Sequence, residues 1–167
     1  VTAIGEVLLA NGSTCEGIVI ESDGQMTIDP SITPPTFSTK DELIDALFQS
    51  GIVGLGGAGF PTSVKFKTDK VIEELVINGA ECEPYLTSDN RIMIERSKEI
   101  VIGAAIMKQV LGGCPAVIGI EENKPEAIAA MKAAVAELQK DAKGYDGISV
   151  MVLKKKYPQG GGKQLID

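Results

Sequence analysis

The feature that most limits the possible folds is an alternation of short apolar runs and amphipathic segments between residues 74 and 153. Runs that are rich in β-branched residues predict buried strands at 74–78 and 116–120 and a third strand at 148–153. Between these runs, helical periodicity predicts helices at 89–95 and 97–111, and another that starts near Pro125. Strands joined through helices by short connections favour a parallel sheet with right-handed crossovers. We therefore predict an α/β fold, a Rossmann-like parallel sheet with flanking helices.

A glycine-rich segment, residues 50–65, precedes the first of these strands. Its bare backbone can reach conformations that are closed to other residues, so a ligand can lie against it. Pro61 suits the first turn of a helix, whose free N–H groups would face an anion. We interpret the segment as a phosphate cradle. A mobile linker is the alternative, which the apolar residues within the segment disfavour: Ile52, Val53, Leu55 and Phe60.

Two familiar phosphate motifs do not apply to this segment. The spacing of Gly54, Gly56 and Gly59 matches the dinucleotide fingerprint, but that fingerprint must follow a strand. Here it follows a predicted helix at 39–49, which has a capping box of Thr39 and Glu42. The helix presents an apolar face of Leu43, Ile44, Leu47 and Phe48. The glycines are not followed by Gly-Lys-Ser/Thr, so a nucleoside-triphosphate P-loop is excluded as well.

Two further loops follow predicted strands. Residues 78–85 combine small residues with the acids Glu81 and Glu83, and residues 154–163 are rich in lysine and glycine. Open α/β sheets bind ligands at the carboxyl ends of their strands, so we expect both loops and the glycine-rich segment on the same side of the sheet. For the first loop a plain turn is the alternative, and for Lys154, Lys155 and Lys156 a solvated run is.

The N-terminal part has a different character. Alternating residues on both sides of Asn11-Gly12 predict a β-hairpin, and prolines then interrupt the chain. We predict three segments: the end of a β-rich, barrel-sandwich-like module at 1–28, a linker at 29–38, and an α/β domain at 39–167 that is truncated at its C-terminus. The chain is accordingly expected to be a fragment of a longer protein.

Composition excludes several functions. The net charge is −7, so a nucleic-acid partner is not expected. No run of eighteen apolar residues and no leader sequence is present, so we expect neither a transmembrane segment nor a signal peptide. There is no histidine, and three widely spaced cysteines do not form a metal or disulfide pattern. A reducing compartment is expected, and the chemistry should come from a bound cofactor.

The motifs resemble a known family. The glycine-rich segment resembles the flavin and NADH loop of the complex I flavoprotein subunit, and more closely that of RnfC, the peripheral subunit of the Rnf electron transport complex. Further segments resemble RnfC in the same order: 78–85, 119–125, 156–160 and 163–166. The resemblance implies non-covalent FMN, NADH as partner, and hydride exchange followed by single-electron transfer to iron–sulfur clusters.

The same resemblance implies the wider setting. The 4Fe-4S clusters would lie outside this chain, ferredoxin would be an indirect partner, and other Rnf subunits would be direct ones. The subunit would be peripheral, at the cytoplasmic face of a cell membrane across which the complex moves ions. The fragment is expected to be inactive alone.

The family pattern also implies the site residues. It puts Gly54, Gly56 and Gly57 against the flavin and its phosphate, with Lys65 as a charge partner. Phe60 would stack on adenine, or be an ordinary buried phenylalanine. Asn78 and Glu83 would hydrogen-bond flavin or nicotinamide-ribose groups, and Glu81 would serve the same site. Tyr157 and Gly160 would border the flavin.

Two departures from the family pattern leave other functions open. Complex I flavoproteins have paired acids where this chain has Gly161 and Gly162, and arginines where it has Val53 and Leu55. The first departure puts NADH contacts at the third loop in doubt, and the second weakens electrostatic binding of phosphates. A non-catalytic assembly module and, from composition alone, an ordinary nucleotide-binding domain are therefore the alternatives.

Overall fold

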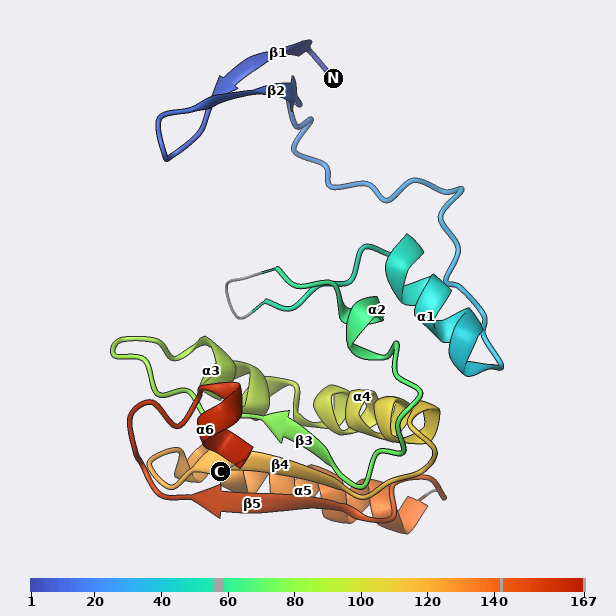
Figure 1. Cartoon of the computed structure of the whole chain (residues 1–167), viewed down its shortest axis with the longest axis vertical. Coiled ribbons are helices and arrows are strands. Elements are labelled where there is room, and N and C mark those ends of the chain that lie inside the picture. The colour runs from blue at the N-terminus through green and yellow to red at the C-terminus, as the bar shows by residue number, and fades with distance from the viewer. Residues whose placement is uncertain (56–58, 142, 167) are drawn as a thin grey trace. The chain divides into compact units, whose positions relative to one another are not determined.

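The computed structural model describes residues 1–55, 59–141 and 143–166. The chain divides into two compact units, Val1–Thr36 and Phe37–Asp167 (Figure 1). The first is a hairpin followed by an extended stretch, and the second contains the helices and the parallel sheet. No helix in the described ranges combines the length and the apolar character that a bilayer crossing requires.

The predicted hairpin is confirmed. β1 (Ala3–Leu8) pairs antiparallel with β2 (Thr14–Val19). The Gly12 N–H donates to the Leu9 carbonyl at 2.9 Å, and Gly12 has φ of +81°, which a side chain would disfavour. Every residue of β1 is exposed, so the backbone ladder holds this unit together without an apolar core.

The predicted capping box and helix are also confirmed, as α1 (Lys40–Gln49). The Glu42 N–H donates to Thr39 Oγ1, and Glu42 Oε2 accepts from the Thr39 N–H, both at 3.2 Å. Leu43 and Ile44 are buried, but Phe48 is 66% exposed, so its assignment to the apolar face was wrong. The third residue that α1 buries is the small Ala46. α1 packs against α2, which is a single turn.

The helix predicted after the glycine-rich segment is short. α2 (Thr62–Lys65) is one turn, and the Thr62 N–H donates to the Ile52 carbonyl at 3.0 Å. The Gly54 N–H likewise donates to the Phe60 carbonyl at 2.8 Å. The two arms of the segment thus pair with each other, and these N–H groups are not available to an anion.

The predicted parallel sheet is confirmed, with the strand order β3-β4-β5. β4 (Ala116–Glu121) is central and buried throughout, as predicted. β3 (Leu75–Asn78) is only half-buried, so the prediction of a buried strand there was wrong, because β3 lies at the edge of the sheet. β5 (Ile148–Leu153) forms the other edge. Asn78 is paired with Gly119, and Glu121 with Leu153.

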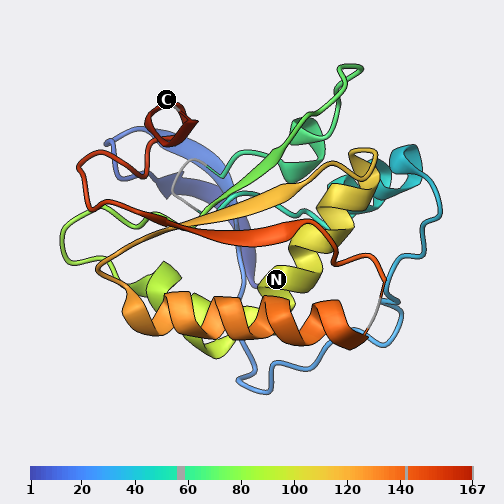
Figure 2. The same ribbon diagram turned by 90° about the horizontal axis from the view of Figure 1, so that it is seen from below.

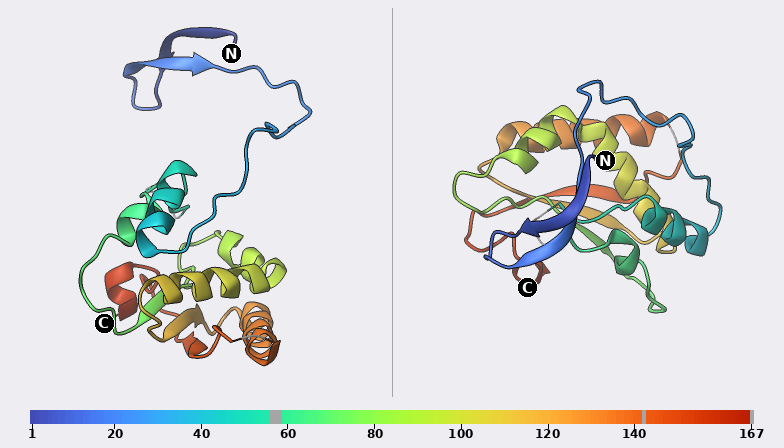
Figure 3. Two further views of the ribbon diagram at one scale, coloured as in Figure 1. Left: turned by 90° about the vertical axis from the view of Figure 1, so that its right-hand side faces the viewer. Right: turned by 90° about the horizontal axis from the view of Figure 1, so that it is seen from above.

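Three helices cover one face of this sheet (Figures 2 and 3). They are α3 (Ser88–Glu95), α4 (Ser97–Val110) and α5 (Pro125–Asp141). The core lies between them and the sheet, and it is built from apolar residues that include Val101, Ala105, Ile118, Ile120, Met131 and Val135. The short α6 (Gly162–Ile166) lies on the opposite face, which α3, α4 and α5 do not cover.

Candidate functional site

Three segments that are far apart in the sequence line one cavity of about 840 Å³. The first is the glycine-rich segment with α2, the second follows β3, and the third follows β5. The lining residues are Gly54, Leu55, Lys65, Asn78, Ala80, Glu81, Glu83, Leu86, Ser88, Asp89 and Gly160. The convergence predicted for the three loops is therefore observed.

Asn78 ties the second and third segments together. Its Nδ2 donates to the Gly160 carbonyl at 2.8 Å, and its Oδ1 accepts from the Ala80 N–H at 3.2 Å. The Gly160 N–H donates to Cys82 Sγ at 3.2 Å. A Cβ added at Gly160 would lie 2.7 Å from the Ala80 carbonyl oxygen, so only glycine allows the two loops to approach this closely.

Gly54 and Lys65 form the side of the cavity that comes from the glycine-rich segment. A Cβ at Gly54 would lie 3.3 Å from Lys65 Nζ and 3.6 Å from the Phe60 carbonyl oxygen. The bare Cα thus leaves a shallow space beside an ammonium group. Close backbone approach beside a positive charge suits a flat, phosphorylated ligand.

Glu81 is held by the protein itself. Its Oε1 accepts from the Asp89 N–H at 2.8 Å, and its Oε2 accepts from Lys124 Nζ at 3.0 Å. The side chains of Glu81 and Lys124 are only 2% and 12% exposed, so this is a buried ion pair. Glu81 therefore fixes the loop after β3 to the start of α3 and to the loop after β4.

The remaining acids make one side of the cavity negative. Partial burial and the nearby carboxylates of Glu81 and Glu83 raise the pKa of Asp89, and Lys124 opposes this shift. The ammonium of Lys65 lines the same cavity. A bound ligand would therefore have positive charge near the glycine-rich segment and negative charge near the loop after β3.

A second cavity of about 430 Å³ adjoins the first, since Glu81, Glu83 and Leu86 line both. Tyr157 from the loop after β5 lines this second cavity, and so does Glu121 at the end of β4. Glu121 did not figure among the predicted site residues. The available signal was an acid directly after the apolar run of β4, but sequence alone does not show whether such an acid is covered.

The structure brings most of the predicted residues together. Gly54, Lys65, Asn78, Glu81, Glu83 and Gly160 line the first cavity and Tyr157 lines the second. Phe60 is 49% exposed and lines neither of these two cavities. The predicted residues Gly56 and Gly57 lie outside the described residues.

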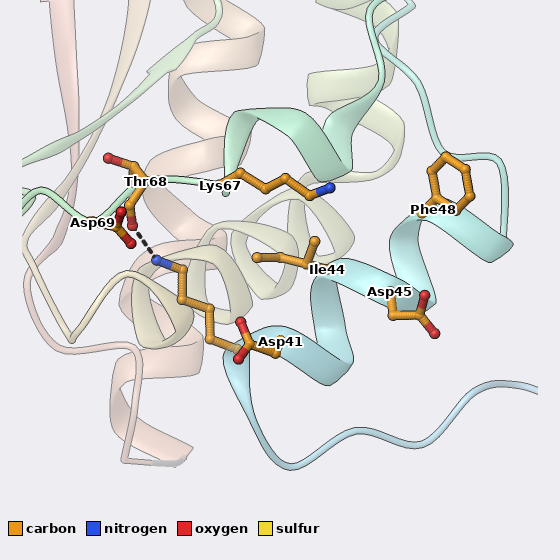
Figure 4. Close-up of a pocket in the computed structure, with 8 residues that line it drawn as sticks. Asp41, Ile44, Asp45, Phe48, Lys67, Thr68 and Asp69 are labelled. Carbon is orange, nitrogen blue, oxygen red and sulfur yellow. Dashed lines mark hydrogen bonds between the residues drawn. The ribbon is translucent and has the colours of Figure 1, made fainter.

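Another hollow, of about 760 Å³, lies between α1 and the chain after α2. In Figure 4, Lys40 Nζ donates to the Thr68 carbonyl, at 2.7 Å, whereas the side chains of Asp45 and Phe48 extend away from this contact. None of the predicted site residues lines it. Among the residues that the structure describes, histidine, cysteine, aspartate and glutamate form no group able to hold a metal ion.

Comparison with known proteins gives a consistent assignment. The family model of the Nuo51 FMN-binding domain matches residues 47–167. The C subunit of an ion-translocating oxidoreductase complex from Serratia proteamaculans is 47% identical over 128 residues, which are 76% of this chain and 17% of that protein. The C subunit of the Na⁺-translocating ferredoxin:NAD⁺ oxidoreductase complex from Acetobacterium woodii is 42% identical over 174 residues, or 99% of this chain and 37% of that one.

A solved structure shares the fold. NAD⁺-reducing [NiFe]-hydrogenase in the air-oxidized state superposes with a TM-score of 0.66 at 21% identity, covering 76% of this chain and 23% of that one. At this identity the likeness concerns the fold alone. The present chain spans well under half the length of the two curated relatives named above.

Proposed function

The chain belongs to the family of Nuo51 FMN-binding domains, and from this premise we propose that its α/β unit binds FMN in the larger cavity, where NADH exchanges a hydride with it. The observation that carries the proposal is the convergence of three separate segments on that cavity. The chain would be one part of an RnfC-like subunit of a membrane-associated NAD:ferredoxin oxidoreductase.

The residues that line the cavity fit the cofactor. Lys65 would pair with the FMN phosphate, next to the bare Cα of Gly54, whose Cβ position adjoins Lys65 Nζ. Asn78 and Gly160 hold the other two loops together, so they would define the edge against which the flavin ring lies. The 840 Å³ of the cavity is in the range of cofactor sites.

FMN, when bound, would supply the exchange of two electrons as a hydride with NADH and the release of single electrons to iron–sulfur clusters. The chain's own residues would bind and orient it. Glu83 and Asp89 place negative charge at the cavity, and negative charge disfavours an anionic reduced flavin and lowers its reduction potential.

The rest of the subunit would complete the electron path. The names of the relatives support ferredoxin as an indirect partner and other subunits of an ion-translocating complex as direct ones. The 4Fe-4S clusters would be carried outside this chain, and the subunit would lie at the cytoplasmic face of the membrane. Residues 1–28 would belong to a preceding β-rich module, with 29–38 as a linker. The piece alone would not reduce ferredoxin.

Flavin titration tests the proposal. Purified protein should quench FMN fluorescence and shift its absorbance, and anaerobic NADH should then bleach the bound flavin. Lack of FMN binding both by this chain and by the whole subunit would contradict the proposal.

The phosphate contact can be tested separately. Replacement of Lys65 by methionine should weaken FMN binding about tenfold, because a charge-assisted contact is lost, while riboflavin binding stays unchanged. Lys67→Met is the matched control, because Lys67 lines the hollow beside α1. Equal effects of Lys65→Met on FMN and riboflavin would exclude a phosphate contact.

A non-catalytic assembly module is the second candidate. Gly161 and Gly162 supply no side chain in the place of the paired acids of complex I flavoproteins, and Gly162 starts α6. This function would be favoured if the protein binds FMN tightly and NADH leaves the flavin oxidised.

A further inference from the structure

Glu121, the last residue of β4, is a buried acid with an unsatisfied carboxylate. The residue is 1% exposed, and neither Oε1 nor Oε2 has a hydrogen-bond partner among the described residues. A buried polar group without a partner destabilises a fold, and a charged one does so more strongly. Two unfilled acceptors therefore call for hydrogen-bond donors from outside this set of residues.

The neighbouring acid shows that the local structure can satisfy a buried carboxylate. Glu81 receives Lys124 Nζ on one oxygen and the Asp89 N–H on the other. Lys124 is thereby already engaged, although its backbone N–H donates to the Glu121 carbonyl at 3.0 Å. Glu81 has a structural task and its contacts are complete, whereas Glu121 lacks the equivalent donors.

Glu121 is also placed where a second reactant would enter. It lines the 430 Å³ cavity, which shares Glu81, Glu83 and Leu86 with the larger cavity assigned to FMN. Hydride transfer requires the nicotinamide ring to lie within about 3.5 Å of the flavin, and therefore in the larger cavity. The group attached to that ring would then reach the adjoining one.

We propose that the Glu121 carboxylate binds the ribose hydroxyls of the nicotinamide half of NADH. This inference rests on the proposed function. Two adjacent hydroxyls supply two donors for two acceptor oxygens, the chemistry by which acidic residues bind ribose in other dinucleotide sites. Glu83 and Lys155 line the same cavity, so its lining carries both signs of charge. The two unfilled acceptors of Glu121 therefore point to a donor-rich sugar.

The replacement Glu121→Met tests this role through two effects of opposite sign. Methionine keeps the length of the side chain and removes both unsatisfied oxygens, so the urea midpoint of the free protein should stay the same or rise. Binding of NAD⁺ to the FMN-loaded protein, measured by calorimetry, should weaken about tenfold to a hundredfold. Glu122→Met is the matched control, because Glu122 is exposed and does not line the cavity.

Hydride donors with and without the sugar identify the contacted group. Anaerobic bleaching of bound flavin should slow in Glu121→Met with NADH and with reduced nicotinamide mononucleotide, both of which carry the ribose. With 1-benzyl-1,4-dihydronicotinamide, which lacks it, the rate should match that of the unmodified protein. FMN affinity should be unchanged.

Three results would overturn the inference: a lowered urea midpoint in Glu121→Met, equal slowing with all three donors, or unchanged NAD⁺ affinity. The first would mean that groups within the protein satisfy the carboxylate. Failure of the unmodified protein to bind FMN would instead contradict the proposed function. In that case direct calorimetric titration with NAD⁺, compared between the unmodified protein and Glu121→Met, still decides the role of Glu121.

Discussion

The two faces of the parallel sheet contrast in what they carry. One face is covered by α3, α4 and α5 (Figure 2). Successive residues of a strand point to opposite faces, so along β4 the core residues Ile118 and Ile120 face these helices, and Gly119 and Glu121 face the other way. The helix-covered face packs apolar side chains into the core. The opposite face has Gly119 and Glu121, which are also buried, and the carboxylate of Glu121 has no hydrogen-bond partner among the described residues. The helix-covered face thus supplies most of the stability, and the opposite face can retain residues such as Glu121 that a ligand would contact.

The largest effect on stability is expected from the buried ion pair of Lys124 and Glu81, which lies on the polar side of the sheet. Lys124→Met should lower the free energy of unfolding by about 4 kcal/mol, because it leaves the Glu81 carboxylate buried without its cation. The double variant with Glu81→Gln should recover most of the loss, since glutamine can still accept from the Asp89 N–H. Urea denaturation measures both. A loss under about 1 kcal/mol would show that the polar side contributes little stability.

The core face should respond nearly as strongly. Ile118→Ala should cost about 3 kcal/mol, from lost burial and the cavity that remains, because Ile118 is 1% exposed. Met151 lies on the opposite face of the neighbouring strand and is 54% exposed, so Met151→Ala should cost only about 0.5 kcal/mol. Equal losses in urea denaturation would contradict the assignment of stability to the helix-covered face.

An intermediate effect is expected where the loops after β3 and β5 meet. Gly160→Ala places a Cβ against the Ala80 carbonyl and should cost about 2 kcal/mol of stability. FMN affinity should fall with it, because the Asn78 contact to the Gly160 carbonyl would be displaced. Gly162→Ala is the control: its Cβ would meet nothing within 4 Å. Similar thermal and FMN-binding shifts in both variants would show that close approach of the loops is unimportant.

Most of the fold was predictable because local and global signals agree. The apolar runs of β4 and β5, the stripe of α5 and the capping box of α1 each specify one structure. The placement of the loops that carry Asn78 and Gly160 at one edge also followed from the sequence, since parallel strands place their carboxyl ends there, but the hydrogen bond between these residues did not.

The failures share a physical cause, which is tertiary context. Periodicity placed Phe48 on the apolar face of α1, but the buried residues of that helix are Leu43, Ile44 and Ala46, and Phe48 is exposed. Backbone N–H groups of the glycine-rich segment and its helix were expected to face an anion, but those of Gly54 and Thr62 are engaged by pairing across the segment. Glu121 could not be recognised, because an acid after a strand is usually solvated and only its surroundings show that it is buried without donors.

The smallest effect concerns pH, and it compares an acid of the site with one remote from it. The folded pKa of Asp89 is raised by partial burial and by the carboxylates of Glu81 and Glu83. The native state then holds the proton longer than the unfolded state, so stability falls as pH rises from about 4 through the folded pKa. The pKa of Glu42 is shifted in the opposite direction, because the N–H groups of Ser38 and Thr39 lower it. Its contribution to stability is therefore present above about pH 4.5 and is lost as pH falls through the folded pKa. In urea midpoints measured from about pH 3 to 7, Asp89→Asn should therefore gain on the unmodified protein as pH rises, and Glu42→Gln should fall behind it. If the urea midpoints of the two variants changed with pH in parallel, the carboxylates around Asp89 would not lower the stability of the folded protein.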